Sequence, residues 1–240
     1  MANLKIIADY HTHTIFSHGK NTIEENVLAA IDKNLSEIAI CDHGPSHIFY
    51  GIKRHKLNEY LDEIARVKKK YKDKIKVLSA LELNVRSFNG FIDVDSETAK
   101  RFDILLLGYH KAVWCDSLDS FFYFTLMRRF NKKNVDKTTR AYIEAIKKNN
   151  IFLIVHPGYG MRLNYDMLIP YLKKYGTAVE INSSHNELSI EDIDAFTKAG
   201  IKLVISSDAH ESSLVGNFDD AYKFAESAEL SNYNILNANE

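Results

Sequence analysis

Histidine and carboxylate side chains gather at the ends of short apolar runs in this sequence, in a pattern typical of metal sites. Nine residues share this placement: His11, His13, His18, His43, Glu82, His110, His156, Asp208 and His210. Imidazole and carboxylate ligands together suit zinc, manganese or iron, whereas calcium and magnesium prefer mostly oxygen ligands. One zinc ion usually takes about three protein ligands and a water molecule. Nine candidates therefore predict two or three divalent transition-metal ions with a bridging carboxylate.

The spacing of several candidates predicts that they face one opening. His11 and His13 lie two residues apart on an extended segment, so both imidazoles face the same side of the chain. Pro157 favours extended backbone at His156, which predicts that this imidazole lies at a strand end. Any one histidine alone is more often a core or surface residue, and a lone acid at such a turn is more often a helix cap. The recurrence after separate apolar runs favours the metal site.

Short apolar runs alternate with helical patterns along the chain, which predicts a mostly parallel α/β barrel. The runs cover residues 4–9, 37–41, 75–81, 103–108, 151–155, 177–181 and 202–206. This alternation is typical of a closed, seven-stranded (β/α)7 barrel of TIM-like architecture, and we expect a single domain over residues 1–240. Functional side chains of such barrels converge just past the carboxyl ends of the strands, where every candidate ligand falls. Thr22 and Glu25 predict a capping box on the first helix.

The longest connection covers residues 111–140. It contains Trp114 and the aromatic run 121–124, which is followed by the basic residues Arg128, Arg129, Lys132 and Lys133. We interpret it as a helix packed on the barrel wall. A substrate lid and a subunit interface are the alternatives, and the second leaves homo-oligomerisation as an open alternative. Closer to the ligands, Cys41 is expected to be a small buried core residue beside His43.

Composition excludes several classes of protein. The 31 basic and 32 acidic residues give a formal net charge of −1, which supplies no field for gripping a polyanion, so extended nucleic acid is not expected as a partner. No apolar stretch approaches the length of about 20 residues that a membrane span needs. Cys41 and Cys115 form neither a metal-binding pair nor a disulfide framework, which favours a reducing compartment. We expect a cytoplasmic location and no membrane partner.

Four motifs taken together resemble those of the PHP family, named for polymerase and histidinol phosphatase. They are the Asp-Tyr-His-Thr-His run at 9–13, Asp-His-Gly-Pro at 42–45, His-Pro-Gly at 156–158 and Ser-Asp-Ala-His at 207–210. The likeness runs nearly end to end and is closest to stand-alone metal-dependent phosphatases of the YcdX type. It implies a distorted seven-stranded TIM-like barrel, in agreement with the strand pattern.

The resemblance also implies an arrangement of three metal ions. One would be held by His11, His13, Glu82 and Asp208. A second would be held by Glu82, His110 and His156, and a third by His18, His43 and His210. Glu82 would bridge the first two ions. Two departures from the YcdX pattern bear on substrate preference: Lys111 replaces an acid after His110, and the spacing from His13 to His18 is one residue shorter.

The predicted reaction is hydrolysis of a small phosphate monoester by a metal-bridging hydroxide held between Glu82 and Asp208. Three acids are expected to accept hydrogen bonds from ligand imidazoles, Asp9, Asp42 and Glu180, although each also reads as an ordinary strand-end acid. The candidates for contacts with substrate are Arg162, Lys111 and Arg54, and each also reads as a solvated surface residue. His185 is the candidate general acid.

Three alternative functions stay open beside a general phosphomonoesterase. One is a histidinol-phosphatase of histidine synthesis, which the resemblance supports equally. A second is a 3′-to-5′ nuclease, which the near-neutral charge disfavours. A third is a non-catalytic metal-binding module, which the complete ligand set disfavours. The salt dependence of DNA binding distinguishes the nuclease, and turnover after metal loading distinguishes the non-catalytic module.

Overall fold

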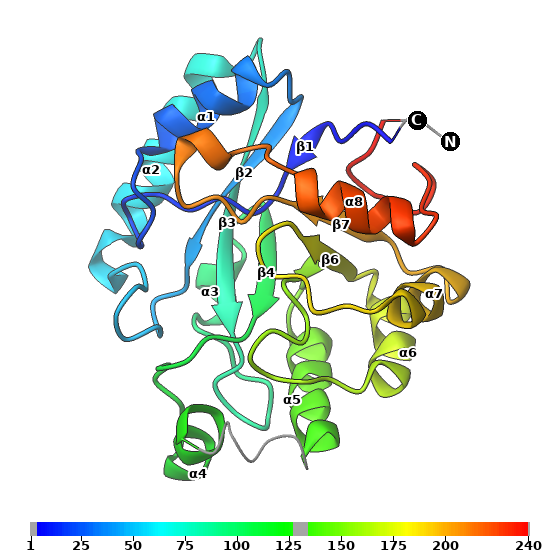
Figure 1. Cartoon of the computed structure of the whole chain (residues 1–240). Coiled ribbons are helices and arrows are strands. Elements are labelled where there is room, and N and C mark those ends of the chain that lie inside the picture. Colours follow the sequence, from blue (N-terminus) through cyan, green and yellow to red (C-terminus); the bar gives the residue numbers. More distant parts are fainter. Residues whose placement is uncertain (1–3, 127–133, 240) are drawn as a thin grey trace.

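The computed structural model describes residues 4–126 and 134–239 and shows a nearly closed barrel of parallel strands with helices around it (Figure 1). The strands follow one another around the barrel in chain order, from β1 to β7. Their bounds are β1 (Ala8–Asp9), β2 (Glu37–His43), β3 (Lys76–Asn84), β4 (Ile104–Gly108), β5 (Leu153–Ile154), β6 (Ala178–Asn182) and β7 (Leu203–Ser206). This confirms the predicted seven-stranded parallel barrel.

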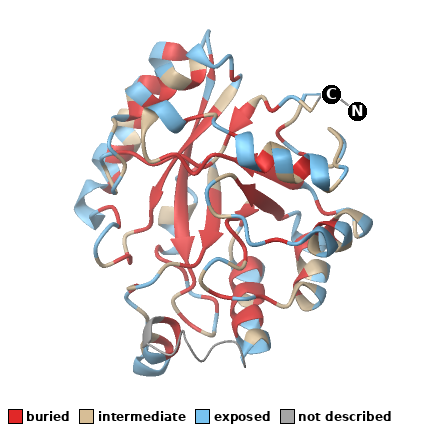
Figure 2. Ribbon diagram, viewed as in Figure 1, coloured by how far each residue is buried: buried red, intermediate tan, exposed pale blue. Residues whose placement is uncertain are grey.

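Helices connect the strands and cover their outer face. They are α1 (Ile23–Asp32), η1 (Arg54–Lys56), α2 (Leu57–Tyr71), α3 (Ser96–Ala99), α4 (Leu118–Phe121), the π-helical turn η2 (Phe122–Leu126), α5 (Val135–Lys148), α6 (Tyr165–Tyr175), α7 (Ile190–Lys198), η4 (Ser212–Leu214) and α8 (Asp219–Ser227). The predicted capping box is confirmed, since Glu25 N–H donates to the Thr22 hydroxyl and Thr22 N–H donates to the Glu25 carboxylate. The faces of the helices that point toward the barrel are buried, and the faces that point away from it are exposed (Figure 2).

Side chains alternate between the barrel interior and the helix layer along each strand. Small and aliphatic residues fill the interior: Ala39, Cys41, Leu78, Ala80, Leu106, Leu153, Val155, Ala178 and Val204. Cys41 is fully buried and free, as predicted. Two residues further along three of these strands, the next inward side chains are His43 on β2, Glu82 on β3 and Glu180 on β6. The ligands His43 and Glu82, with Glu180, therefore form the next layer of the barrel interior.

The barrel closes through segments that flank the ends of β1 and β7. Beyond these strands Thr12 and Ala209 form a parallel bridge, and His13 N–H donates to the Ala209 carbonyl at 2.7 Å. At the level of the strands the gap is filled by Asn237 of the C-terminal segment. Its side-chain amide donates to the carbonyls of Ala8 and Ile205, each at 2.7 Å. The C-terminal segment thus stands in for direct pairing between β1 and β7, and both termini lie on this side (Figure 1).

Two predicted strands are shorter than expected. The sequence pattern predicts a first strand over residues 4–9, but Ile7 N–H donates to the Asn237 carbonyl and Ile6 bridges to Ala238. Only Ala8–Asp9 pairs with β2. The fifth predicted strand, 151–155, narrows to Leu153–Ile154, the residues in register with both β4 and β6. Partners from distant segments, which a local pattern does not reveal, set both limits.

The long connection after β4 packs partly on the barrel wall. Tyr123 and Phe124 are buried, and their rings lie 4.9 and 5.2 Å from the ring of Phe88. Trp114, by contrast, is 60% exposed. Four basic residues of this connection, Arg128, Arg129, Lys132 and Lys133, lie outside the described residues. No helix of the described segments is long and apolar enough to cross a membrane.

Candidate metal centre

Glu82 lies at the centre of the histidine cluster and is fully buried. Its Oε1 atom is 2.7 Å from Nε2 of His156 and 3.0 Å from Nε2 of His110. Its Oε2 atom is 2.6 Å from Nδ1 of His43 and 3.5 Å from Nε2 of His11. One carboxylate thus faces imidazoles that come from four different strand ends.

Asp208 forms the second carboxylate of the cluster. Its Oδ1 atom lies 3.2 Å from Nε2 of His13, 3.5 Å from Nε2 of His11 and 3.7 Å from Nδ1 of His210. The backbone at Asp208 has a φ of 56°, and at His156 a φ of 31°, both in the left-handed region that non-glycine residues rarely adopt, so the extended backbone predicted at His156 is wrong. Backbone strain of this kind persists where the surrounding structure fixes it and is frequent at functional sites.

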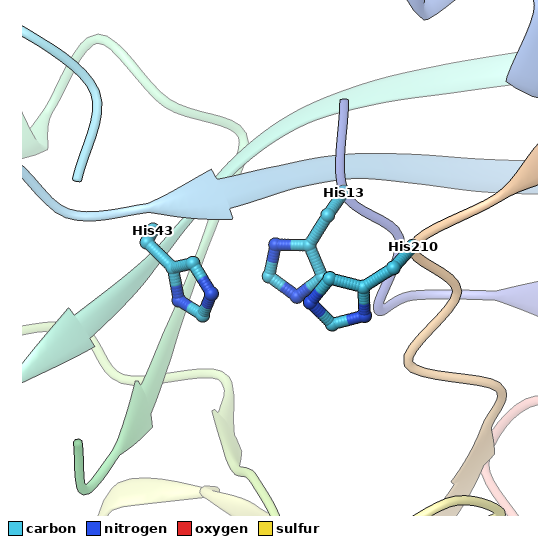
Figure 3. Close-up of side chains that lie close together, drawn as sticks. All are labelled: His13, His43 and His210. Carbon is cyan, nitrogen blue, oxygen red and sulfur yellow. The ribbon is translucent and has the colours of Figure 1, made fainter. Parts of the chain in front are cut away.

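Eight of the nine predicted ligands form four overlapping groups whose ligand atoms lie within 4.8 Å of one another. The groups are His13, His43 and His210; His11, His156 and Asp208; His11, His13 and Glu82; and His43, Glu82 and His110. Figure 3 shows the first group, with His13 following β1, His43 at the end of β2 and His210 following β7. The ninth, His18, has its ring centroid 4.3 Å from that of His210 and 4.8 Å from that of His43.

Two observations show that this donor set fits metal ions. Nε2 of His11 is buried and makes no hydrogen bond within the described structure, and Oε2 of Glu82 lies 2.6 Å from Nδ1 of His43 without the geometry of a hydrogen bond; a bound cation would relieve this costly arrangement. The cluster also depends on a glycine, because a Cβ at Gly108 would lie 2.8 Å from Cε1 of His156 and 3.1 Å from Oε1 of Glu82. The donors are nitrogen and carboxylate oxygen, the set preferred by zinc, manganese and iron.

The electrostatics of the cluster favour ionised carboxylates. Burial opposes ionisation of Glu82, but the imidazoles of His110 and His11 outweigh it and hold the pKa of Glu82 well below its ordinary value. Burial likewise opposes ionisation of Asp208, but the imidazoles of His11 and His13 outweigh it and hold the pKa of Asp208 well below its ordinary value. Metal ligation requires these charged carboxylates.

Burial keeps two of the imidazoles neutral. It lowers the pKa of His13 to about 3, and it lowers the pKa of His43 well below its ordinary value. A neutral imidazole offers a nitrogen lone pair to a metal ion, whereas a protonated one does not. His11 behaves differently: although burial opposes its charge, Asp208, Glu180 and Glu82 raise its pKa. The metal-free cluster therefore combines neutral and charged imidazoles around its carboxylates.

Polar groups behind the cluster orient the imidazoles. Glu180 accepts a hydrogen bond from Nδ1 of His11 at 2.8 Å and another from the backbone N–H of His156 at 2.6 Å. Asn84 accepts from Nδ1 of His110 at 2.8 Å. Asn182 bridges the acids, because its amide lies 3.0 Å from Oε2 of Glu180 and 3.1 Å from Oδ2 of Asp208. Sequence reasoning missed Asn84 as a positioning residue, although it lies two residues after Glu82 on the same inward face of β3.

Asp9 and Asp42 hold loops, contrary to the expectation that they orient imidazoles. Asp42 accepts from the Thr14 backbone N–H at 2.8 Å and from the hydroxyls of Thr14 and Ser17. Asp9 accepts from the Ser207 hydroxyl at 2.5 Å. Asp42 alternates with His43 on β2, so its side chain lies on the opposite face of the strand. These acids thus fix the segments after β1 and β7 that carry the ligands.

A cavity of about 380 Å³ opens beside the cluster. Its lining includes the candidate general acid His185, the candidate substrate residue Lys111, and Asp208 with five of the ligand histidines. Burial lowers the pKa of His185. Its remaining walls come from His47, Phe49, Tyr50, Tyr109, Ala112, Tyr159 and Gly160. The cavity is therefore the place where a small ligand can reach the cluster.

Two of the predicted substrate residues lie elsewhere. Arg162 lines a separate pocket with Tyr165, Asp166 and Glu187. Arg54 directs its guanidinium to the carbonyl of Asp93 at 3.0 Å and does not line the cavity. Both predictions assumed that a loop after a ligand-bearing strand turns toward the cluster, and these two side chains turn away from it.

The family assignment follows from comparison with known proteins. The PHP domain family matches residues 9–228, which include all nine candidate ligands. The chain belongs to the PHP family. The expected resemblance to this family is therefore confirmed, and six of the nine candidate ligands lie in the four motifs on which it was based.

Curated relatives of this PHP chain align over nearly its full length. A protein of Thermoanaerobacter sp. (strain X514) named "Probable phosphatase" is 28% identical, over 98% of this chain and 91% of its own. Another of the same name, from Shewanella sediminis, is 28% identical over 98% and 90%. Among solved structures, the histidinol phosphate phosphatase of Lactococcus lactis has a TM-score of 0.60 at 16% identity, covering 92% of this chain and 93% of that one. That structure supports the PHP barrel fold.

The cavity wall of this PHP chain is built by two segments distant in sequence. Ile48 N–H donates to the Ala112 carbonyl and Trp114 N–H donates to the Ser46 carbonyl, each at 2.9 Å. Within this wall Tyr50 N–H donates to Nδ1 of His47 at 3.1 Å, so the proton of a neutral His47 ring resides on Nε2. A local sequence pattern does not reveal the burial of His47, because the pairing that buries it joins separate connections.

Proposed function

We propose that this PHP chain hydrolyses small phosphate monoesters with two or three divalent ions of zinc, manganese or iron. The observation that carries the proposal is the fully buried Glu82, surrounded by imidazoles from four strand ends and lying beneath an open cavity. A buried carboxylate shared among imidazoles is the arrangement that bridges metal ions. The names of the curated relatives support phosphatase activity.

The residues that would hold the ions are the predicted ligands: His11, His13, His18, His43, Glu82, His110, His156, Asp208 and His210. Bound divalent ions supply a hydroxide nucleophile near neutral pH and offset the charge of the phosphoryl oxygens. Glu180 and Asn84 keep the imidazoles of His11 and His110 oriented, since each accepts a hydrogen bond from the Nδ1 atom and leaves Nε2 facing the cluster.

Side chains of the cavity would bind the ester. The ammonium of Lys111 is the cationic side chain beside the described cluster and would pair with the phosphate. His185 would supply the proton to the leaving oxygen. Because burial lowers its pKa, that role predicts a turnover that favours acidic pH. Histidinol phosphate is one candidate substrate, since the Lactococcus lactis structure is described as a complex with zinc, L-histidinol and phosphate.

The test is turnover with a matched pair of variants. Protein loaded with manganese or zinc is assayed with p-nitrophenyl phosphate, histidinol phosphate and a single-stranded oligonucleotide. We expect release of phosphate from monoesters, loss of turnover with chelator, and a decrease of at least about 10³-fold in Glu82→Gln. Glu37→Gln, at the opposite end of β2 and paired with Lys76, is the control and retains activity. Cleavage of the oligonucleotide alone would favour the nuclease, and absence of any turnover would favour a non-catalytic metal module.

A further inference from the structure

Two tyrosine rings extend the cavity wall directly from the ligand cluster. The ring of Tyr50 stacks on that of His18, with centroids 4.5 Å apart and planes 25° apart. The ring of Tyr159 lies 5.8 Å from that of His156. Tyr50 is 48% exposed and Tyr159 is 41% exposed, although both line the cavity. Each ring therefore keeps accessible surface next to the place where a phosphate would bind.

Both rings are held in place before any ligand binds. The Tyr50 ring lies against His18 and, at 5.1 Å, against the ring of His47, a residue bridged to Val113 whose Nδ1 also accepts the Tyr50 backbone N–H. Tyr159 donates its backbone N–H to the His156 carbonyl at 3.0 Å, and its ring stacks on that of His185 with centroids 4.3 Å apart. Rigid aromatic side chains bind planar groups well because little conformational entropy is lost.

The charges of the cavity disfavour a cationic leaving group. Asp208 is the one carboxylate among its lining residues in the described chain, and it is occupied by His13 and His11. Lys111 adds a positive charge at the rim, and bound metal ions would add more. An ammonium group, such as that of histidinol, would therefore find no acid to pair with and would meet like charges.

We propose, on the basis of the proposed function, that the natural leaving group carries an uncharged planar aromatic ring, stacked on Tyr50 or Tyr159, and no ammonium group. The substrate class is an aryl-bearing or heteroaryl-bearing phosphate monoester. Water cleaves its P–O bond to give inorganic phosphate and the free alcohol, which takes up the proton. A cavity of about 380 Å³ accommodates a single ring with its phosphate.

The test uses two pairs of esters on the metal-loaded protein. Benzyl and cyclohexylmethyl phosphate have the same carbon count but differ in planarity. Histidinol phosphate and 3-(imidazol-4-yl)propyl phosphate differ only in the amino group. We expect kcat/KM to favour benzyl phosphate by about tenfold, the upper range for one aromatic contact, and to favour the deaminated ester because it lacks the ammonium group. Tyr50→Leu and Tyr159→Leu lower the preference for benzyl phosphate, whereas Tyr233→Leu, 82% exposed on the C-terminal segment, does not.

Binding gives a readout that does not need turnover. Calorimetry compares benzylphosphonate with cyclohexylmethylphosphonate, and we expect the same preference in Kd and the same loss in the tyrosine variants. Equal kcat/KM within both ester pairs, together with equal Kd for the two phosphonates, would overturn the aromatic substrate class and leave the phosphatase intact. Selective phosphonate binding without hydrolysis of any ester would support the aromatic surface and overturn the phosphatase. Neither binding nor hydrolysis would overturn both.

Discussion

Oε1 of Glu180 lies 2.8 Å from Nδ1 of His11, inside the barrel and away from solvent. The carboxylate accepts the Nδ1 proton, so the lone pair of the neutral imidazole is on Nε2, which faces Oε2 of Glu82 at 3.5 Å. Glu180 also accepts the backbone N–H of His156. One acid on β6 thus positions two ligands from other strands.

Glu180→Gln tests this positioning role. The substitution replaces one acceptor oxygen with an NH₂ group, which meets the donors of His156 or His11. We expect metal affinity to decrease by about 10–100-fold, the usual effect of losing such a partner, with the fold retained. The measurement is a competition titration with a zinc chelator, alongside circular dichroism. Glu187→Gln, from the separate pocket of Arg162, is the control. Equal zinc affinity in both variants would exclude a positioning role for Glu180.

Gly108→Ala tests the space that the cluster needs. The new Cβ would approach His156 and Glu82 to 2.8 and 3.1 Å, so at least one ligand has to move. We expect loss of bound metal and a decrease in turnover of at least about tenfold, as small displacements of catalytic groups produce. Gly176→Ala is the control, because Gly176 has a φ of 69° and no neighbour within 4 Å. It should cost about 1 kcal/mol of stability while retaining the metal. Full metal content in Gly108→Ala would contradict the close packing.

His47 predicts a pH dependence of the metal-free protein. Burial, with the nearby His110, lowers the pKa of His47 to about 4, below the ordinary value of 6.5. A depressed histidine pKa stabilises the fold above pH 6.5, and this contribution is lost as pH falls toward 4. His47→Gln keeps an acceptor for Tyr50 N–H and removes the titration. Its Tm should therefore decrease less than that of the wild type between pH 7 and pH 5, measured by scanning calorimetry with chelator present. Equal decreases in Tm for the wild type and His47→Gln would show that the pKa of His47 is the same in the folded and unfolded states.

Asn237→Ala tests closure of the barrel by the C-terminal segment. Asn237 is buried and donates to Ala8 and Ile205, while its Oδ1 accepts from Ile205 N–H at 3.1 Å. Removing these bonds leaves buried carbonyl and amide groups without partners, so the free energy of unfolding should decrease by at least about 2 kcal/mol. Urea unfolding measures this change. Asn239→Ala, at an exposed position nearby, should change it by less than about 0.5 kcal/mol. Equal stability of the two variants would mean that β1 and β7 do not need this bridge.

The strand pattern and the ligand motifs made the barrel and the ligand cluster predictable. Apolar runs ending in His43, Glu82 and Asp208 are local signals, and the barrel brings their ends together. The shorter β1 was not predictable, because its neighbour Asn237 lies at the far end of the chain. The two-residue period of a strand could have predicted that Asp42 does not face the imidazoles, since consecutive side chains of β2, such as Asp42 and His43, lie on opposite faces.

The substrate side of the centre was less predictable for a physical reason. Tyr50 and His47 reach the cavity only because residues 46–48 pair with residues 112–114, a contact between two irregular connections. Arg162 has the guanidinium group that commonly binds phosphate, but the direction of its loop places it in another pocket. Loop direction depends on tertiary packing, whereas ligand placement follows from strand ends.

The most direct test of the metal centre is the metal content of the purified protein, measured by elemental analysis on a sample also assayed with p-nitrophenyl phosphate. A phosphatase built on Glu82 and Asp208 predicts two or three zinc, manganese or iron ions per chain, with turnover lost on chelation and restored when the metal returns. Zero or one ion per chain, with no hydrolysis of any phosphate monoester after manganese or zinc is added, would contradict it.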